Sequence, residues 1–358
     1  MSNRFLSSGV YGCVYYPLYS CKGKELNDNG YVTKLVKYDF TSKMEIEIGT
    51  ILNKHKNEFI LVEKKCEINN EDLKYSSMLP KCELLKKDKQ IEKKYILLYS
   101  KYVNTKELAD YLNKNINSKL IIQTFLMLCK RIDVLIQNGI IHHDLHFGNI
   151  LINKTNLYVI DFGLSMIQSK FYIGNRLNYE YLKEVIFNYS PKWKYWTLEY
   201  HFICYLIKED NILTYDIIEY TINTYLLEHK NIKLLNVSFV NNFRKSAIMF
   251  FSKFINQQKD NIIFELLSYS NTWDFYKSGL HYLDIYYDVE MNDPSFLMLL
   301  IMMIHPDPTF RPSRIEMQTL LEIYKTNYNF SSTTPVKHFS KQLSRELKRE
   351  TPRKIKLN

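Results

Sequence analysis

The chain has 358 residues, of which 46% are hydrophobic, and its formal net charge is +10. This length is sufficient for a fold with two hydrophobic cores. The longest uninterrupted apolar run, Phe296 to Ile304, is too short to cross a bilayer, and the N-terminus lacks the pattern of a signal peptide. The composition therefore argues against a membrane-spanning or exported protein.

The six cysteines are scattered along the chain, and none belongs to a Cys-x-x-Cys pair. This spacing suggests neither a zinc site nor a framework of disulfides. We therefore expect free thiols, Cys13 among them, and an intracellular, cytoplasmic setting that keeps them reduced.

The first predicted elements are a glycine-containing segment and a strand. Gly9 and Gly12 stand three positions apart within residues 7–15. A hairpin turn explains this spacing as well as a close approach of the backbone to a ligand does. Residues 31–36 follow as a predicted strand that carries Lys34.

Two helices and a second strand follow. Residues 43–55 repeat apolar side chains at helical spacing, and Glu45 and Glu47 flank that stripe on opposite sides. Either glutamate can therefore face the lysine-bearing strand. Residues 95–103 predict a buried strand, and residues 119–137 predict a strongly apolar helix that serves as scaffold.

The most specific pattern begins at residues 141–151, where Asn149 follows Asp144 by five positions. A second apolar run, residues 157–160, leads directly into Asp161. This alternation predicts two strands with polar groups at their edges. The spacing suits phosphoryl transfer from ATP, because one carboxylate can accept a proton while the other two groups bind magnesium. The alternative is a pair of turn aspartates beside a buried histidine.

Taken in order, these motifs resemble those of the eukaryotic-type protein kinases from about Leu6 to about Tyr324. The resemblance implies an α+β, bilobal fold, with a β-rich N-lobe over residues 1–101 and a mainly helical C-lobe over residues 102–328. It also implies ATP and Mg²⁺ as cofactors and Ser/Thr hydroxyls of protein substrates as acceptors.

The resemblance further implies a role for each matching residue. Asp144 takes the place of the catalytic base, and Asn149 and Asp161 take the places of the magnesium ligands. The implied nucleotide-binding positions are Ser7, Gly9, Gly12 and Val14 in the phosphate loop, Lys34 with Glu45 preferred over Glu47, the hinge residues Lys101 and Val103, and Leu151. Glu107 is either a ribose contact or a first-turn helix residue.

Three further residues match positions that brace the C-lobe of protein kinases. Glu199 resembles the glutamate that closes the activation segment, and Arg311 resembles its buried partner. Asp274 resembles the aspartate that holds the backbone of the catalytic loop. These three positions favour a protein kinase over a small-molecule kinase.

Two histidines depart from the family pattern. His146 stands where most serine/threonine kinases have a lysine that contacts the γ-phosphate, and it is a candidate catalytic residue beside Asp144 and Lys34. The same string occurs in small-molecule kinases of the aminoglycoside or choline type, which remain an alternative, as does a nucleotide-binding pseudokinase scaffold. His143 replaces the arginine that reads a phosphorylated activation loop, so we expect activity without that phosphorylation.

The C-lobe is longer than is typical, because about 75 residues separate Glu199 from Asp274. This insertion at about 200–270 contains helical patterns over 216–227 and 237–255, and it either docks partners or enlarges the core. Long insertions and a composition rich in Ile, Asn, Lys and Tyr are similar to the kinases of large nucleocytoplasmic DNA viruses. That resemblance implies the host cytoplasm or a virion as the location.

The positive charge gathers at the C-terminus, where residues 337–358 hold eight Lys or Arg against two Glu. Residues 331–335 read as a linker. We expect residues 329–358 to form a flexible basic tail with a short helix over 340–349. Deleting the residues from Pro335 onward should leave catalysis nearly intact. Such a tail contacts nucleic acid, acidic proteins or anionic membrane, or it stays solvated without a partner.

Overall fold

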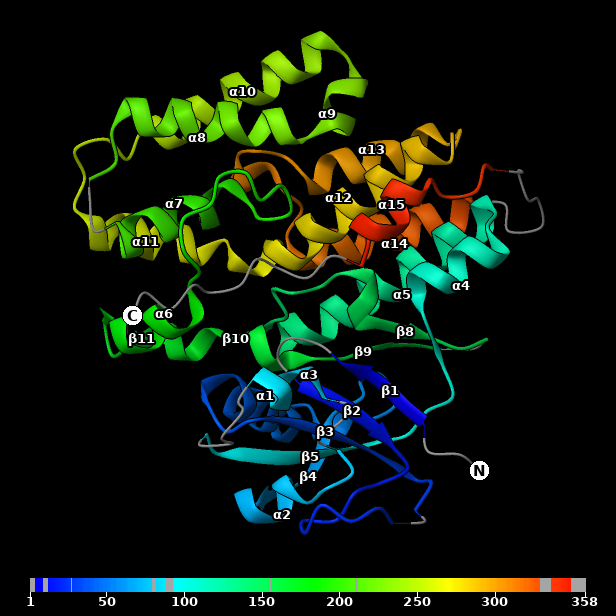
Figure 1. Cartoon of the computed structure of the whole chain (residues 1–358). Helices are drawn as coiled ribbons and strands as arrows, with labels where there is room; N and C mark the ends of the chain where they lie inside the picture. Colours follow the sequence, from blue (N-terminus) through cyan, green and yellow to red (C-terminus); the bar gives the residue numbers. More distant parts are fainter. Residues whose placement is uncertain are drawn as a thin grey trace. The chain divides into compact units, whose positions relative to one another are not determined.

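The structure is a computed structural model that describes residues 4–8, 12–26, 28–78, 82–87, 93–154, 156–209, 212–328 and 336–348. The chain divides into two compact units, residues 1–106 with 151–165 and residues 107–150 with 166–358. The first unit is built around a β-sheet, and the second is mainly helical (Figure 1). The predicted α+β class, with a small β-rich part and a larger helical part, is confirmed.

The first unit is centred on a five-stranded antiparallel sheet of order β1-β2-β3-β5-β4. Its strands are β1 (Arg4–Ser8), β2 (Gly12–Tyr16), β3 (Tyr31–Lys37), β4 (Val62–Ile68) and β5 (Tyr95–Lys101). Its helices are α1 (Phe40–Ile51), α2 (Asn70–Lys74) and α3 (Glu83–Lys87). Strand β5 is buried at every position from Tyr95 to Tyr99, and its side chains contribute to two hydrophobic clusters, as expected for a central strand covered on both faces.

Helix α1 begins at a capping box and turns one glutamate inward. The carboxylate of Asp39 accepts hydrogen bonds from two N–H groups of the first turn, and the hydroxyl of Ser42 accepts one from the N–H of Asp39. Met44, Glu45 and Ile48 are buried on the helix. A carboxylate buried among apolar side chains requires a partner of opposite charge.

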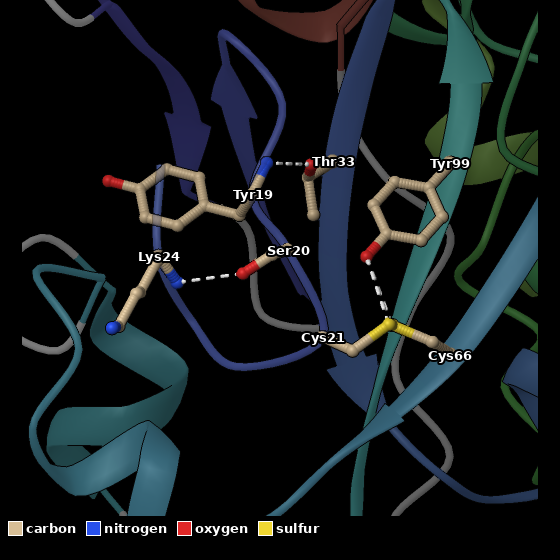
Figure 2. Close-up of a disulfide and its surroundings, with 7 residues drawn as sticks. All are labelled: Tyr19, Ser20, Cys21, Lys24, Thr33, Cys66 and Tyr99. Carbon is tan, nitrogen blue, oxygen red and sulfur yellow. Dashed lines mark hydrogen bonds between the residues drawn. A yellow bond between two sulfur atoms is a disulfide. The ribbon is translucent and has the colours of Figure 1, made fainter. Parts of the chain in front are cut away.

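Two disulfides link cysteines within the first unit, so the expectation of free thiols is wrong for these four residues. Cys13 on β2 pairs with Cys82 beside α3, and Cys21 pairs with Cys66 on β4. Figure 2 shows the second bond, with the hydroxyl of Tyr99 3.0 Å from the Sγ of Cys66. The partners are 69 and 45 positions apart, so only the folded sheet brings them together. These four cysteines therefore give no indication of a reducing compartment.

The second unit is a helical assembly around one central helix. Its helices are α4 (Leu108–Asn115), α5 (Ser118–Gln137), α6 (Tyr179–Val185), α7 (Leu198–Lys208), α8 (Tyr215–Glu228), α9 (Lys230–Leu235), α10 (Val237–Ser252), α11 (Lys259–Ser268), α12 (Trp273–Asp288), α13 (Pro294–Met303), α14 (Arg314–Asn327) and α15 (Lys341–Glu346). Helix α12 is buried from Trp273 to Tyr286, as expected for a helix surrounded by others. Within the described part of the chain, no helix is long and apolar enough to cross a membrane.

Short strands connect these helices and carry the chain between the two units. They are β6 (Lys106–Glu107), β7 (Ile140–Ile141), β8 (Ile150–Ile152), β9 (Leu157–Val159), β10 (Met166–Ile167), β11 (Tyr172–Ile173) and β12 (Arg176–Leu177). Strands β7 and β10 pair with each other, as do β8 with β9 and β11 with β12. The β8–β9 pair leads into Asp161.

The insertion after Glu199 forms helices, two of which contain the expected helical patterns. Helix α8 covers residues 216–227, and α10 covers residues 237–252. Figure 1 shows α8, α9 and α10 side by side, and α8 buries Ile218, Ile222 and Tyr225. At least part of the insertion therefore enlarges the apolar core.

The described part of the C-terminal tail, residues 336–348, is packed onto the second unit, which differs from the flexible tail expected from the sequence. Phe339, Leu343 and Leu347 are 8%, 5% and 0% exposed. Helix α15 begins at Ser340, whose hydroxyl accepts a hydrogen bond from the N–H of Leu343. The basic composition concealed three apolar residues at helical spacing. Deleting residues from Pro335 onward would therefore expose apolar surface.

Candidate active site

The first unit brings Lys34, Glu45 and Asp161 together. Strand β3 places Lys34 opposite Val14 of β2. The Nζ atom of Lys34 lies 3.0 and 2.9 Å from the two carboxylate oxygens of Glu45 and 2.9 Å from Oδ1 of Asp161. One ammonium group therefore holds two carboxylates from segments that are far apart in the sequence.

The charges of this cluster depend on one another. Burial lowers the pKa of Lys34, but the carboxylates of Asp161 and Glu45 outweigh burial, so the pKa rises above its usual value. Burial raises the pKa of Glu45, and Lys34 acts against that increase. The lysine therefore stays charged at neutral pH and supplies a fixed positive charge beside Asp161.

Asp161 occupies the left-handed region of the backbone, with φ of 64°. Few residues other than glycine adopt this conformation, although aspartate tolerates it better than most. The next residue, Phe162, is buried and packs edge-on against Phe59 at 5.9 Å between ring centroids. The ring anchors a strained turn that points the carboxylate of Asp161 toward Lys34.

The glycine-containing segment is described only in part. Ser7 lies in β1, Val14 lies in β2 beside Lys34, and Gly9 lies outside the described residues. Gly12 begins β2 and approaches β3 closely, because an added Cβ would lie 2.7 Å from Cγ1 of Val36. Glycine is therefore required at position 12 for the pairing of β2 with β3.

The expected hinge is a loop between two strands. Lys101 ends β5, and Val103 follows in a loop where its carbonyl accepts a hydrogen bond from the hydroxyl of Thr105. Leu151 is half-buried at the centre of β8. Glu107 is the residue that precedes α4, where it forms an ion pair with Lys348 at 2.8 Å.

In the second unit, the loop of residues 142–149, the candidate catalytic loop, brings Asp144 and Asn149 together. The side-chain Nδ2 of Asn149 donates to the carbonyl of Asp144 at 3.0 Å and to its Oδ2 at 3.2 Å. The Nδ1 of His146 accepts a hydrogen bond from the N–H of Gly148, and its Nε2 lies 3.7 Å from Oδ2 of Asp144. An accepting Nδ1 places the proton of a neutral ring on Nε2. His146 therefore orients toward the carboxylate of Asp144.

Asp274 and Lys277 of α12 hold the backbone of this loop through hydrogen bonds. The N–H groups of His142 and His143 donate to Asp274 at 2.7 and 3.0 Å, and the ammonium group of Lys277 donates to the carbonyl of His143 at 2.8 Å. Burial raises the pKa of Asp274 and lowers that of Lys277, although Asp144 and Asp274 act against the latter decrease. The sequence pattern did not predict a role for Lys277, although its position about one helical turn after Asp274 places both residues on the same face of α12.

His143 lies in an aromatic enclosure and has φ of 62°. Its ring is buried, with centroids 4.3 Å from Tyr200, 5.5 Å from Phe187 and 5.9 Å from Trp196. These aromatic residues come from the segment that begins at Met166 and from α7. Aromatic packing therefore surrounds the ring of His143.

Glu199 and Arg311 form the buried ion pair that the resemblance implies. Both side chains are almost fully buried, and the guanidinium contacts both carboxylate oxygens, with Nη2 3.0 Å from Oε2. Trp273 donates to the same carboxylate at 3.0 Å. A bidentate, fully hydrogen-bonded pair of this kind fixes the start of α7.

The oxygen atoms of Asn149 and Asp161 suit magnesium. Both side-chain hydrogen bonds of Asn149 use Nδ2, so Oδ1 is the atom that could bind a cation, and Asp161 keeps 39% of its side chain exposed. Magnesium prefers a few protein oxygens together with water and phosphate oxygens. Within the described residues, no three His, Cys, Asp or Glu side chains form a metal-binding cluster.

Comparison with known families supports the same kind of domain. The ABC1 atypical kinase-like domain matches residues 89–180, about a quarter of the chain. The match supports a protein-kinase-like domain. The matched residues run from β5 through the catalytic loop and Asp161 into α6. No curated protein matches the chain.

Proposed function

We propose that the protein is a serine/threonine protein kinase that transfers the γ-phosphate of Mg-ATP to protein hydroxyls. The observation that carries this proposal is the ion-pair cluster of Lys34, Glu45 and Asp161. Lys34 is positively charged in this cluster and can bind phosphate, and Asp161 keeps an exposed oxygen that can bind a cation. Two carboxylates also share Lys194 and Lys348, so what supports a catalytic role for this cluster is the place of Lys34 and Asp161 in the kinase-like order of motifs.

In the proposed reaction, the residues act mainly by positioning and electrostatics. Lys34 neutralises phosphate charge, and Asn149 and Asp161 hold magnesium, which stabilises the charge on the phosphate oxygens. Asp144 orients the attacking hydroxyl and accepts its proton, while His146 keeps the Asp144 carboxylate in place.

The preference for a protein acceptor rests on the bracing of the second unit. The Glu199–Arg311 pair and the contacts of Asp274 match the protein-kinase pattern at all three positions. The aromatic packing around His143 supports activity without prior phosphorylation of the activation segment. Serine or threonine as the acceptor is the default for this resemblance.

Transfer of labelled γ-phosphate to a mixed panel of basic and acidic proteins, followed by phosphoamino-acid analysis, tests the proposal. We expect label on serine or threonine. Label on aminoglycosides or choline, with none on any protein, would instead assign a small-molecule kinase. Label on tyrosine alone would preserve the kinase but contradict the proposed acceptor.

A further inference from the structure

The C-terminal strap, defined as residues 336–348, reaches the catalytic loop. The carbonyl of Leu347 accepts a hydrogen bond from the N–H of Phe147 at 2.8 Å. Phe147 is only three residues beyond Asp144. A backbone carbonyl that accepts a hydrogen bond from a loop is one of the contacts by which a protein holds a bound peptide. The strap thus occupies backbone groups directly beside the proposed catalytic base.

The next residue of the strap, Lys348, is held by two carboxylates. Its Nζ lies 2.8 Å from Oε2 of Glu107 and 2.8 Å from Oδ1 of Asp110, at the start of α4. Its backbone carbonyl passes close to Gly148, 3.6 Å from where a Cβ would stand. Glu107 and Asp110 remain 43% and 56% exposed beside this lysine. The surface therefore accepts a basic side chain that arrives from solvent.

Glycine at position 148 contributes to this surface. An added Cβ would also lie 2.8 Å from Cε1 of His146, so a larger residue would disturb the loop that His146 orders. The absence of a side chain keeps the surface beside the loop open to a passing backbone. The backbone hydrogen bond of Phe147 and the ion pairs of Lys348 thus lie next to each other on the second unit.

Only part of the strap is closely packed. An open pocket of about 500 Å³ lies beside α15, and its lining includes Lys194, Asp284 and Glu346. Lys194 bridges the other two residues at 2.9 Å each. The helix of the strap is therefore held by the buried side chain of Leu343 and by the ion pair of Glu346 with Lys194.

We propose that Glu107, Asp110 and the backbone of residues 147–148 form a docking site for a basic stretch of a polypeptide substrate, and that the strap occupies this site in cis. This inference rests on the proposed protein-kinase function and deepens it. The strap competes with substrate, so releasing Lys348 opens the site. The occupant is a polypeptide because one continuous segment, the end of α15 with Lys348, uses both the backbone hydrogen bond and the paired carboxylates.

Two charge reversals on the strap provide the test. Lys348→Glu removes the ion pairs to Glu107 and Asp110 and adds repulsion. Lys337→Glu is the matched control, because Lys337 forms an ion pair with Glu290 on the same strap, both side chains being 65% exposed. The probe is a fluorescein-labelled peptide with the sequence of residues 340–358, and its binding is measured by anisotropy.

We expect Lys348→Glu to bind the peptide roughly three- to tenfold more tightly than the wild type does, as the loss of two partly exposed ion pairs implies. The Lys337→Glu control should bind like the wild type. Adding Glu107→Gln and Asp110→Asn to Lys348→Glu should abolish the gain. Unchanged binding by Lys348→Glu, or a lower melting temperature without tighter binding, would show that the strap is only a structural brace.

A kinetic comparison separates this inference from the proposed function. A serine peptide with three lysines and its glutamine counterpart serve as acceptors. Lys348→Glu should lower KM for the lysine peptide by a similar factor and leave the glutamine peptide unaffected. Transfer that is equal for both peptides in all variants contradicts the docking site. Absence of transfer to either peptide, with the binding gain intact, contradicts the proposed function alone.

Discussion

At the scale of single residues, the charge of Lys34 is shared between two carboxylates with different surroundings. Glu45 is nearly buried, whereas Asp161 keeps 39% of its side chain in solvent. The buried partner fixes the position of the ammonium group, and the exposed partner remains accessible to a cation. The two carboxylates therefore have different roles, although both contact Nζ of Lys34.

Glu45→Gln should lower kcat/KM for phosphate transfer by roughly tenfold or more, because Lys34 loses its buried anchor and its alignment with phosphate. Glu47→Gln, two positions further along α1, is the control and should retain nearly full activity. Steady-state kinetics at several ATP concentrations provides the measurement. Equal losses in the two variants would show that charge anywhere on α1 matters, and that the Lys34–Glu45 contact has no special role.

At the scale of elements, the first unit is constrained by covalent links as well as by its sheet. The two disulfides close loops across β2, β4 and the segment before α3. Each disulfide of this kind typically contributes about 2–4 kcal/mol, mainly by restricting the unfolded chain.

Reduction should therefore lower the melting temperature of the first unit. A variant with serine at positions 13, 21, 66 and 82 should melt at the lower temperature whether or not a reductant is present. Thermal denaturation with and without dithiothreitol measures the melting temperatures of the wild type and the variant. A wild type that melts at the same temperature in both conditions would contradict a stabilising role for the disulfides.

Local patterns predicted the elements that carry the site, but not the contacts between distant segments. The catalytic loop, Asp161 and α1 follow from short-range spacing, and the structure has each of them. The disulfide pairs and the contact of Lys277 were not predicted, because the partners are 45 or more positions apart in the sequence. The packing of the strap was not predicted, because three apolar residues within a basic segment give a weaker pattern than the charge of that segment does.

At the scale of the whole molecule, buried neutral histidines make folding sensitive to acid. Burial lowers the pKa of His201 to about 3, and burial also lowers the pKa values of His229 and His281 well below their usual range. Below about pH 6.5 the unfolded chain takes up protons at these positions while the folded chain does not. The stability contributed by these histidines is therefore complete above pH 6.5 and is lost as the pH falls.

Between pH 6.5 and 5, each such histidine should reduce the free energy of unfolding by up to about 1.4 kcal/mol per pH unit. The raised pKa values of Glu45 and Asp274 act in the opposite sense, so a variant isolates the effect. His201→Gln should flatten the slope, whereas His338→Gln, at an exposed position, should not. Urea denaturation at several pH values measures the slopes, and identical slopes for wild type and His201→Gln would refute the assignment.

The central claim is that Asp144 acts in phosphate transfer while other residues bind the nucleotide. Single-turnover transfer of γ-phosphate by wild type and Asp144→Asn, each saturated with Mg-ATP and with nucleotide affinity measured in parallel, tests it most directly. We predict nucleotide affinity close to that of wild type and a transfer rate lower by about 100-fold or more. Equal transfer rates in the two proteins would contradict the account.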